Sequence, residues 1–230
     1  METLQMTYTD FMGLALRPVS ADRSFFAICI DYPVMTDKKK AQQGGSDQEK
    51  TNFIMELVGR SRTGDRQAIE ALYRHFRGPL FGLAFRYTYN STAAEDILQD
   101  VFLKVFTHLH SLDRDETFVS WLYRVAINTC LSYLRTHKKW LHRRVSLNDV
   151  GELSNGISVP PGEQMSYKSL EEAIQNLPTR LKSVFLLHEV QGFKHQEIAQ
   201  ILKCSVGTSK SQLFKARMKI RKQLAYKDNL

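Results

Sequence analysis

Apolar residues recur every three or four positions along most of the chain after Thr51. The repeat covers these stretches: residues 52–76, 77–90, 91–112, 118–139 and, after a gap, 169–230. Such spacing places apolar side chains on one face of an α-helix. No strand-like alternation of apolar and polar residues interrupts the first four stretches. The pattern therefore predicts an all-α protein.

The gap between the helical stretches predicts two small helical domains, residues 51–140 and 169–230, joined by a flexible linker. Residues 141–168 contain paired prolines, three glycines and several serines without a helical period. Residues 1–50 show no sustained period, so we expect a disordered leader. Met35 precedes the polar part of this leader, so we hypothesise that translation starts there. Detection of peptides from residues 1–34 in cells would exclude this hypothesis.

Local signals predict where the helices of the first domain begin and end. Gly78 and Pro79 mark a break between the first two stretches, or the start of the second. Ser91 or Thr92 is expected to cap the third stretch, with Glu95 as the capping-box partner of Thr92.

The stretch from residue 118 to 139 carries two different stripes along one helix. The first is mainly apolar and is expected to face a core: Phe118, Leu122, Val125, Ala126, Thr129 and Tyr133. The second combines a flat ring, an amide, a hydroxyl and three cations: Trp121, Arg124, Asn128, Ser132, Arg135 and Lys139. These groups suit the bases and phosphates of a nucleic acid.

Charge and cysteine content narrow the class of protein. The formal net charge of +8 points to a polyanionic partner, with membrane headgroups as the other candidate. The three cysteines are far apart and form no CxxC pair, so we expect neither a zinc ribbon nor a disulfide framework. The longest early apolar run, "FFAICI", is too short to cross a bilayer. The sequence predicts an intracellular protein without direct membrane insertion.

A helix-turn-helix is predicted in "HQEIAQILKCSVGTSKSQLFKARMKIRKQL". The first helix is expected to end near Leu202, with a tight connection through Cys204 and a second helix capped by Ser205. Apolar residues share one face of the second helix, and the opposite face is polar and cationic: Ser211, Gln212, Lys215, Lys219 and Lys222. Such a helix enters the major groove of DNA, although a charged face that merely contacts solvent has the same pattern.

Three stretches together resemble the extracytoplasmic-function (ECF) group of bacterial sigma-70 family factors. They are "AEDILQDVFLKVF", "FVSWLYRVAINTCLSYLR" and "LPTRLKSVFLLHEVQGFKHQEIAQIL...SVGTSKSQLFKAR". The resemblance runs from about residue 51 to 226, with the domains in the family's order. It implies a cytoplasmic bacterial sigma factor that binds core RNA polymerase and promoter DNA. Region 2 would open the minus-ten element, and region 4 would bind the minus-thirty-five element.

The resemblance assigns roles to residues of the first domain. The helix "AEDILQDVFLKVF" matches the family's polymerase-binding helix, which implies polymerase contacts by Asp96, Gln99, Asp100 and Phe102. The second stripe of residues 118–139 would hold unpaired minus-ten DNA, and the loop "SLDRDETF" would form a pocket for a flipped base. Ser132 replaces an amide found in some relatives. The alternative to polymerase contact by Phe102 and to DNA contact by Trp121 is that each ring only packs within the protein.

The resemblance also assigns the DNA contacts of the second domain. Residues overlying the family pattern "GTVKSRLHRAR", together with one further lysine, are expected to touch the minus-thirty-five element: Lys210, Ser211, Gln212, Phe214, Lys215 and Lys219. Ser209 stands where the family usually has Val, which predicts looser packing beneath the helix. Gln212 replaces a usual Arg and is better matched to adenine.

Other function classes fit the sequence less well. A standalone helix-turn-helix regulator would have no use for aromatics that hold single-stranded DNA. His188, Glu189, His195 and Glu197 lack the HExxH spacing of zinc enzymes, and no nucleophile motif or phosphate loop is present. We therefore expect that the protein is not an enzyme and that it binds no metal or cofactor. The resemblance also implies an anti-sigma factor as an expected partner. The linker, with its acidic residues, is either a flexible tether or a segment that imitates nucleic acid.

Overall fold

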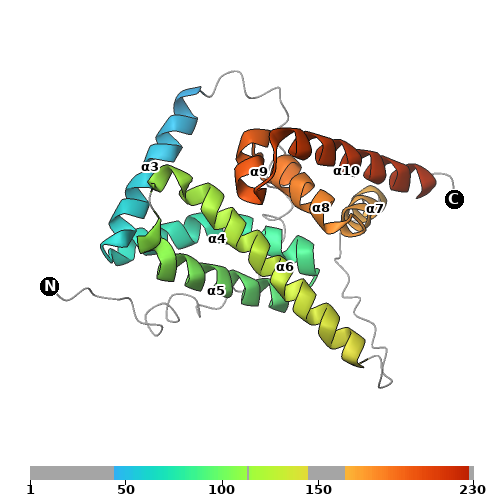
Figure 1. Ribbon diagram of the computed structural model, residues 1–230, viewed down its shortest axis with the longest axis horizontal. Helices are drawn as coiled ribbons and strands as arrows, with labels where there is room; N and C mark the ends of the chain where they lie inside the picture. Colours follow the sequence, from blue (N-terminus) through green and yellow to red (C-terminus); the bar gives the residue numbers. More distant parts are fainter. Residues whose placement is uncertain (1–43, 113, 145–163, 228–230) are drawn as a thin grey trace. The chain divides into compact units, whose positions relative to one another are not determined.

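The computed structural model describes residues 44–112, 114–144 and 164–227 (Figure 1). These residues form helices and connecting turns, with no strand among them. The elements are α3 (Gly44–Arg62), α4 (Arg66–Thr88), α5 (Ser91–His108), η2 (Leu109–Ser111), η3 (Asp115–Thr117), α6 (Phe118–Arg144), α7 (Gln164–Gln175), α8 (Thr179–Phe185), the π-helical η4 (Leu186–Val190), α9 (His195–Leu202) and α10 (Val206–Lys227). The predicted all-α class is confirmed.

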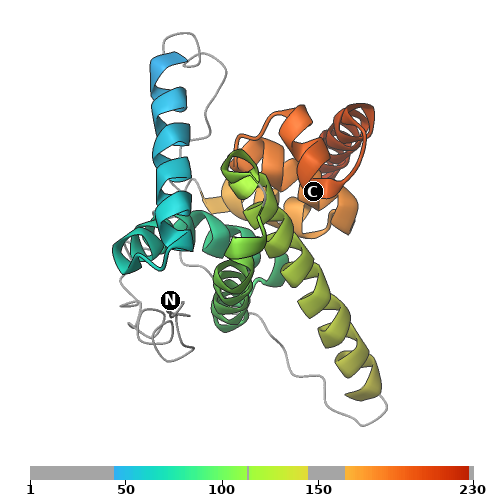
Figure 2. The ribbon, with the colours of Figure 1, turned by 60° about the vertical axis from the view of Figure 1, so that its left-hand side comes forward.

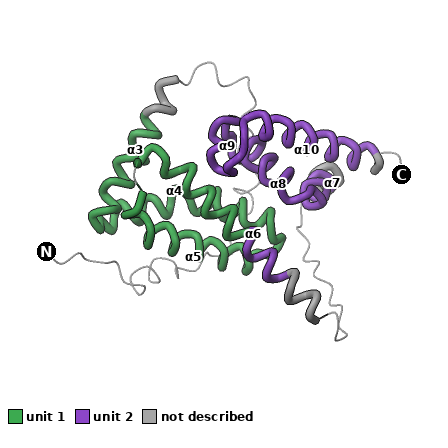
Figure 3. The backbone as a smooth tube through the Cα atoms, viewed as in Figure 1, with its two compact units in different colours: residues 1–130 green, residues 131–230 purple. Residues whose placement is uncertain are grey.

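The chain divides into two compact units, residues 1–130 and 131–230 (Figure 3). The division falls inside α6, which continues as one helix to Arg144. Helical structure therefore extends past residue 140, and α7 begins at Gln164 rather than Ser169. Residues 145–163, the rest of the predicted linker, lie outside the described residues, as do residues 1–43 of the predicted leader.

The first unit is built around the pairing of α4 with α5, and α3 packs against α4 at a steep angle (Figures 1 and 2). Aromatic rings join the helices: Phe76 meets Phe118 edge-on at 5.8 Å between ring centroids, and Tyr73 meets Phe102 at 4.7 Å. The larger buried side chains of this core are Leu57, Val58, Ile69, Leu72, Phe76, Leu80, Phe81, Leu83, Tyr87, Ile97, Leu98, Val101, Phe102, Val105, Leu109, Phe118, Leu122, Tyr123 and Ile127.

The predicted break at Gly78 and Pro79 is wrong, because α4 runs through Pro79 without interruption. A proline inside a helix costs about 3 kcal/mol. Burial of each large apolar side chain contributes roughly 1.5–3 kcal/mol, and α4 buries several on both sides of Pro79. The chain instead breaks at Gly64, whose φ of +83° suits a glycine, before Asp65 caps α4 by accepting from two backbone N–H groups.

Two helix starts also differ from the predicted positions. Asn90, rather than Ser91 or Thr92, caps α5, and its side-chain oxygen accepts from the Ala93 N–H at 2.9 Å. Tyr89 follows α4 with a left-handed φ of +52°, so Tyr89 and Asn90 alone separate the two helices. Helix α3 begins at Gly44, inside the predicted leader, although its first residues, Gly44 to Asp47, have low helix propensity.

The second unit packs α7, α8, η4 and α9 around α10. Its buried apolar side chains are Ala173, Ile174, Leu177, Val184, Leu186, Leu187, Ile198, Ile201, Leu213, Ala216 and Ile220. Lys182 of α8 is buried among them, with 7% of its surface exposed. Burial lowers the pKa of the Lys182 ammonium from 10.5 to about 8, and the negative charge of Glu171 offsets part of this effect.

We expect Lys182→Met to raise the unfolding temperature of the chain at pH 7. Methionine is an apolar side chain of similar length, so the substitution removes the buried charge and keeps the packing. The stabilisation is on the order of 1–3 kcal/mol. Because the folded pKa lies below the unfolded one, the unfolded chain binds more protons between these values, and the wild type recovers stability as pH rises from 8 to 10.5. Thermal unfolding at pH 7 and pH 10 should show the gap shrinking, and an equal gap at both values would contradict this.

Candidate nucleic-acid interface

The polar stripe of α6 forms a continuous helix edge. At 100° per residue its members fall within a sector of about 80°. Asn128, Ser132 and Arg135 are exposed, whereas Trp121 and Arg124 are partly covered. The side chain of Lys139 lies outside the described residues. The described part of this edge thus offers a ring, two cations and two uncharged hydrogen-bonding groups.

The buried face of α6 is rotated slightly from the predicted one. Tyr123, Ile127 and Cys130 are buried, while Val125 and Tyr133 are only partly covered. Burial raises the pKa of the Cys130 thiol to about 12, so this thiol stays protonated and unreactive at neutral pH.

A pocket opens beside Trp121, at the start of the polar edge of α6. It has a volume of about 260 Å³ and is lined by Ser111, Leu112, Arg114, Thr117 and Trp121. An indole ring forms part of its wall, and hydroxyl groups and a guanidinium supply polar contacts. The wall thus offers one ring surface and several hydrogen-bonding groups.

Arg62 of α3 braces the loop that forms this pocket. Its guanidinium lies 2.7 Å from the Asp115 carboxylate and donates a hydrogen bond to the carbonyl of Leu112. Both charged side chains are about three-quarters covered. Sequence reasoning missed Arg62, since it lies 50 residues before Leu112 and belongs to no local motif.

The proposed polymerase-binding residues of α5 separate into two groups. Asp96 and Asp100 are exposed and Gln99 is partly exposed, so these three form a polar helix face. Phe102 is only 1% exposed and stacks on Phe106 in the core, so its expected polymerase contact is wrong. Helix periodicity could not separate the two roles, because Phe102 lies at the edge of the apolar face.

The helix-turn-helix is formed by α9 and α10 in the second unit. Helix α9 ends at Leu202 as predicted, and Lys203 turns the chain with a left-handed φ of +51°. Ser205 caps α10, with its hydroxyl accepting from the Thr208 N–H at 3.0 Å. Both the helix end and the cap predicted from the sequence are confirmed.

Helix α10 exposes most of the residues expected to contact DNA: Lys210, Ser211, Phe214, Lys215 and Lys219. Gln212 is partly covered. Phe214 is 65% exposed, which is unusual for so large an apolar side chain in water. Met218, one turn further along the same side, is also exposed and was not singled out from the sequence.

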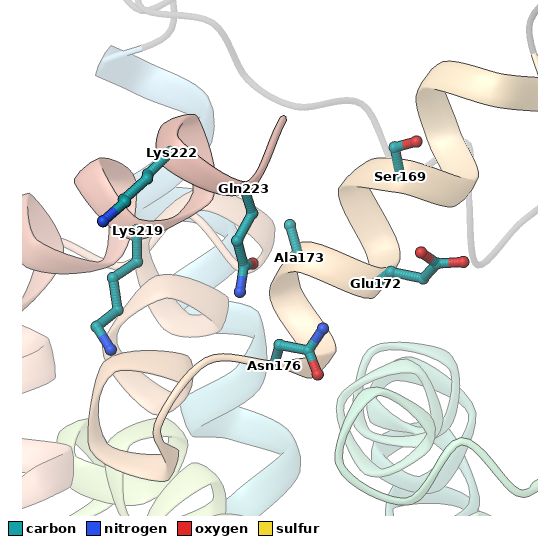
Figure 4. A pocket seen from close by; sticks show the side chains of 7 residues that line it. All are labelled: Ser169, Glu172, Ala173, Asn176, Lys219, Lys222 and Gln223. Atoms are coloured by element: carbon teal, nitrogen blue, oxygen red, sulfur yellow. The ribbon is translucent and has the colours of Figure 1, made fainter. Parts of the chain in front are cut away.

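Lys219 also lines a groove between α10 and α7. Figure 4 shows Lys219, Lys222 and Gln223 on one side of it and Ala173 and Asn176 on the other. The volume of the groove is about 490 Å³. Lys219 thus lies on the flank of α10 nearest α7.

Ser209, which the sequence suggested could loosen the packing beneath α10, has a polar partner in the structure. Ser209 is fully buried, and its Oγ lies 2.9 Å from Nδ1 of His195 in α9. His195 therefore cannot serve as a metal ligand through Nδ1, and Glu197 instead accepts from the Lys194 N–H at 2.6 Å. No group of His, Cys, Asp or Glu suited to a metal ion occurs among the residues that the structure describes.

None of the helices in the described ranges is long and apolar enough to span a membrane. The exposed faces of α6 and α10 are instead cationic, polar and aromatic, the chemistry of a nucleic-acid surface.

Two family models match the chain, Sigma-70 region 2 over residues 72–140 and Sigma-70, region 4 over residues 167–220. The ECF RNA polymerase sigma-E factor of Haemophilus influenzae is 32% identical over 178 residues, which cover 73% of this chain and 93% of that relative. The chain belongs to the ECF group of the sigma-70 family. The RNA polymerase sigma-H factor of Pseudomonas aeruginosa is 31% identical over 182 residues. The aligned region covers 74% of this sigma factor and 92% of that relative.

Two solved structures share the fold of this sigma factor. CnrH in complex with the cytosolic domain of CnrY has a TM-score of 0.58 at 19% identity, covering 76% of this chain and 98% of that one. The sigma factor RpoE in complex with the anti-sigma factor NepR from Bartonella quintana has a TM-score of 0.57 at 20% identity, covering 68% and 98%. The family and fold class predicted from the sequence are confirmed, and this ECF sigma factor is a transcription initiation factor.

We expect Arg62→Ala to slow promoter opening by this sigma factor about three- to tenfold, because the pocket loop loses a partly buried ion pair and a hydrogen bond. Permanganate reactivity of unpaired thymines in the holoenzyme complex measures opening. Arg74→Ala is the matched control, since Arg74 is largely exposed and its ion pair is with Glu70 of its own helix. Equal opening by both variants would exclude the bracing role.

Proposed function

We propose that α6 holds the unpaired strand of the minus-ten element and that the pocket beside Trp121 receives a base flipped out of it. The observation that carries this proposal is the position of the pocket. It lies where the loop of residues 111–117 meets the start of a helix edge with two described cations, Arg124 and Arg135. A base in the pocket and its phosphates along that edge would be bound together.

Energetic balance favours this mechanism without ATP. Taking one base out of the stack costs a few kcal/mol. Stacking that base on an aromatic ring returns roughly 1–3 kcal/mol, and the cations of α6 add attraction for the single-stranded backbone. A few such contacts shift the equilibrium from duplex toward open DNA.

In the second unit, α10 is the proposed recognition helix for the minus-thirty-five duplex. Lys210 and Lys215 would contact phosphate or guanine, and Ser211 would hydrogen-bond a base edge. Gln212 suits adenine, although its partial burial limits its reach. The exposed ring of Phe214 suits the methyl group of thymine. Duplex binding here would hold the promoter while α6 captures the melted strand.

The exposed face of α5 is the proposed contact with core RNA polymerase, now reduced to Asp96, Gln99 and Asp100. Lys104 pairs weakly with Asp100 at 4.0 Å and lies 3.2 Å from the Thr129 hydroxyl, which ties this face to α6. Because the polymerase carries out the chemistry, we propose that the sigma factor is not an enzyme and needs no cofactor. Its proposed location is the bacterial cytoplasm.

An anti-sigma factor is a proposed regulatory partner. Both structural neighbours were solved with a bound protein partner, the cytosolic domain of CnrY and the anti-sigma factor NepR. A partner that covers α10 or the edge of α6 would block DNA binding. A standalone DNA-binding regulator has no comparable support.

We expect Trp121→Ala to lower the extent of promoter opening by roughly 5- to 100-fold, the equivalent of one lost stacking contact. Fluorescence of 2-aminopurine placed at a minus-ten base of the non-template strand reports its unstacking in the holoenzyme. Trp121→Phe keeps a flat ring and should retain most of the opening. Wild-type opening by the Ala variant would show that Trp121 only packs against Phe118, whose ring centroid lies 6.3 Å away.

We expect Lys215→Ala to weaken holoenzyme binding to a promoter with an intact minus-thirty-five element about 5- to 100-fold at moderate salt. Arg180→Ala is the matched control, because it removes one exposed positive charge from α8 in the same unit. Affinity measured by fluorescence anisotropy should fall for the first variant only. An unchanged affinity for Lys215→Ala would count against docking of α10 on the duplex.

A further inference from the structure

A polar cluster of five side chains joins α10 to η4 and α9, running from the buried Ser209 to the exposed Arg217. His188 and Glu189 come from η4, His195 from α9, and Ser209 and Arg217 from α10. The His188 and His195 rings stack with centroids 4.8 Å apart, and His195 Nδ1 lies 2.9 Å from Ser209 Oγ. Arg217 donates to Glu189 Oε1 from Nε at 3.0 Å, and His188 Nδ1 lies 3.2 Å from the same oxygen.

The cluster attaches α10 to the rest of the second unit at two positions. Ser209 and Arg217 are eight residues apart, which is about 12 Å along a helix. Two polar attachments at that separation restrict both rotation and tilt of α10, in addition to its apolar contacts. Ser209 has no exposed surface, so its hydroxyl depends on a protein partner. His195 is the described side chain within hydrogen-bond distance of it.

We propose that His195 is a positioning residue, which sets the orientation of the recognition helix through Ser209 and thereby the strength of minus-thirty-five recognition, and that protonation of its ring weakens this recognition. The proposal rests on the proposed contact between α10 and duplex DNA. It adds a residue that does not itself touch DNA.

The charges around His195 explain why a neutral ring suits this position. Burial comes first, and the positive charges of His188, Lys210 and Arg217 add to it; all lower the pKa of His195, while Glu189 raises it. His195 is also the first residue of α9, where the helix dipole disfavours a cation. The ring is therefore neutral at pH 7. The stability contributed by the neutral ring is present above its ordinary pKa and is lost as pH falls through the lowered value. Protonation leaves the Ser209 hydroxyl able to accept from Nδ1, but it places a cation near Lys210 and Arg217, both on α10, and this repulsion acts on the recognition helix.

The test compares four holoenzymes, reconstituted with the full-length wild type, His195→Leu, Ser209→Val and the double variant. The measured quantity is the ratio of affinities for a promoter with an intact and one with a scrambled minus-thirty-five element. His195→Leu leaves the Ser209 hydroxyl buried without its partner and should lower this ratio about five- to tenfold. The double variant replaces both polar partners with apolar groups and should return to within about twofold of the wild type.

A pH series separates positioning from simple loss of stability. The wild-type ratio should fall between pH 7.5 and pH 5.5, whereas the double variant should stay flat. His195→Asn keeps a hydrogen-bonding atom near the Nδ1 position but cannot be protonated, so it should match the wild type at pH 7.5 and stay flat. This variant carries the test if thermal unfolding shows that His195→Leu does not fold.

Two outcomes would overturn the proposal: an unchanged ratio for His195→Leu, or an equal pH dependence in the wild type and the His195→Asn variant. Lys215→Ala in the same assay distinguishes the two levels of inference. If it leaves the ratio unchanged, the proposed role of α10 fails. If it lowers the ratio while folded His195→Leu does not, only the positioning role of His195 fails.

Discussion

The rotation of α6 about its own axis is the constraint on which the first unit depends. Phe118 and Leu122 are buried, Phe118 meets Phe76 of α4 edge-on, and Ile127 and Cys130 extend the buried face along the helix. Burial of these side chains contributes several kcal/mol, far more than any exposed contact of the polar edge. Because the two stripes adjoin on one helix, the packing that fixes the first also sets the direction of the second. The surface proposed to bind DNA thus follows from the core.

The pocket beside Trp121 adds a constraint that the helix alone does not provide. Its wall combines one residue of α6 with a loop, and a loop has few contacts of its own to hold its shape. Arg62 supplies this support from α3 through Asp115 and the Leu112 carbonyl. The cost of ordering the pocket is then met on folding, before any base enters, which lowers the entropy lost on binding.

Much of this structure could be predicted from local patterns. The all-α class, the end of α9 and the Ser205 cap depend on residues within a few positions of one another, and all agree with the structure. The predictions failed where distant packing decides the result. Pro79 continues a helix because large side chains on both sides of it are buried, and Phe102 enters the core because Tyr73 and Phe106 surround it. Both results depend on contacts between residues that are distant in the sequence or on the number of buried side chains. The spacing of apolar residues along the chain does not reveal either.

The effect of Ser209, which departs from the family pattern, depends on its hydrogen-bonding partner His195. Taken alone, a hydroxyl in place of a buried methyl group predicts weaker packing, since an unpaired buried polar group costs about 1–3 kcal/mol. The structure pairs it with His195, 14 residues earlier, on the other helix of the motif. An apolar contact, which is independent of pH, has thus become a polar one that includes a titratable ring. In the proposed role of His195, this exchange makes the orientation of α10 sensitive to the charge on that ring.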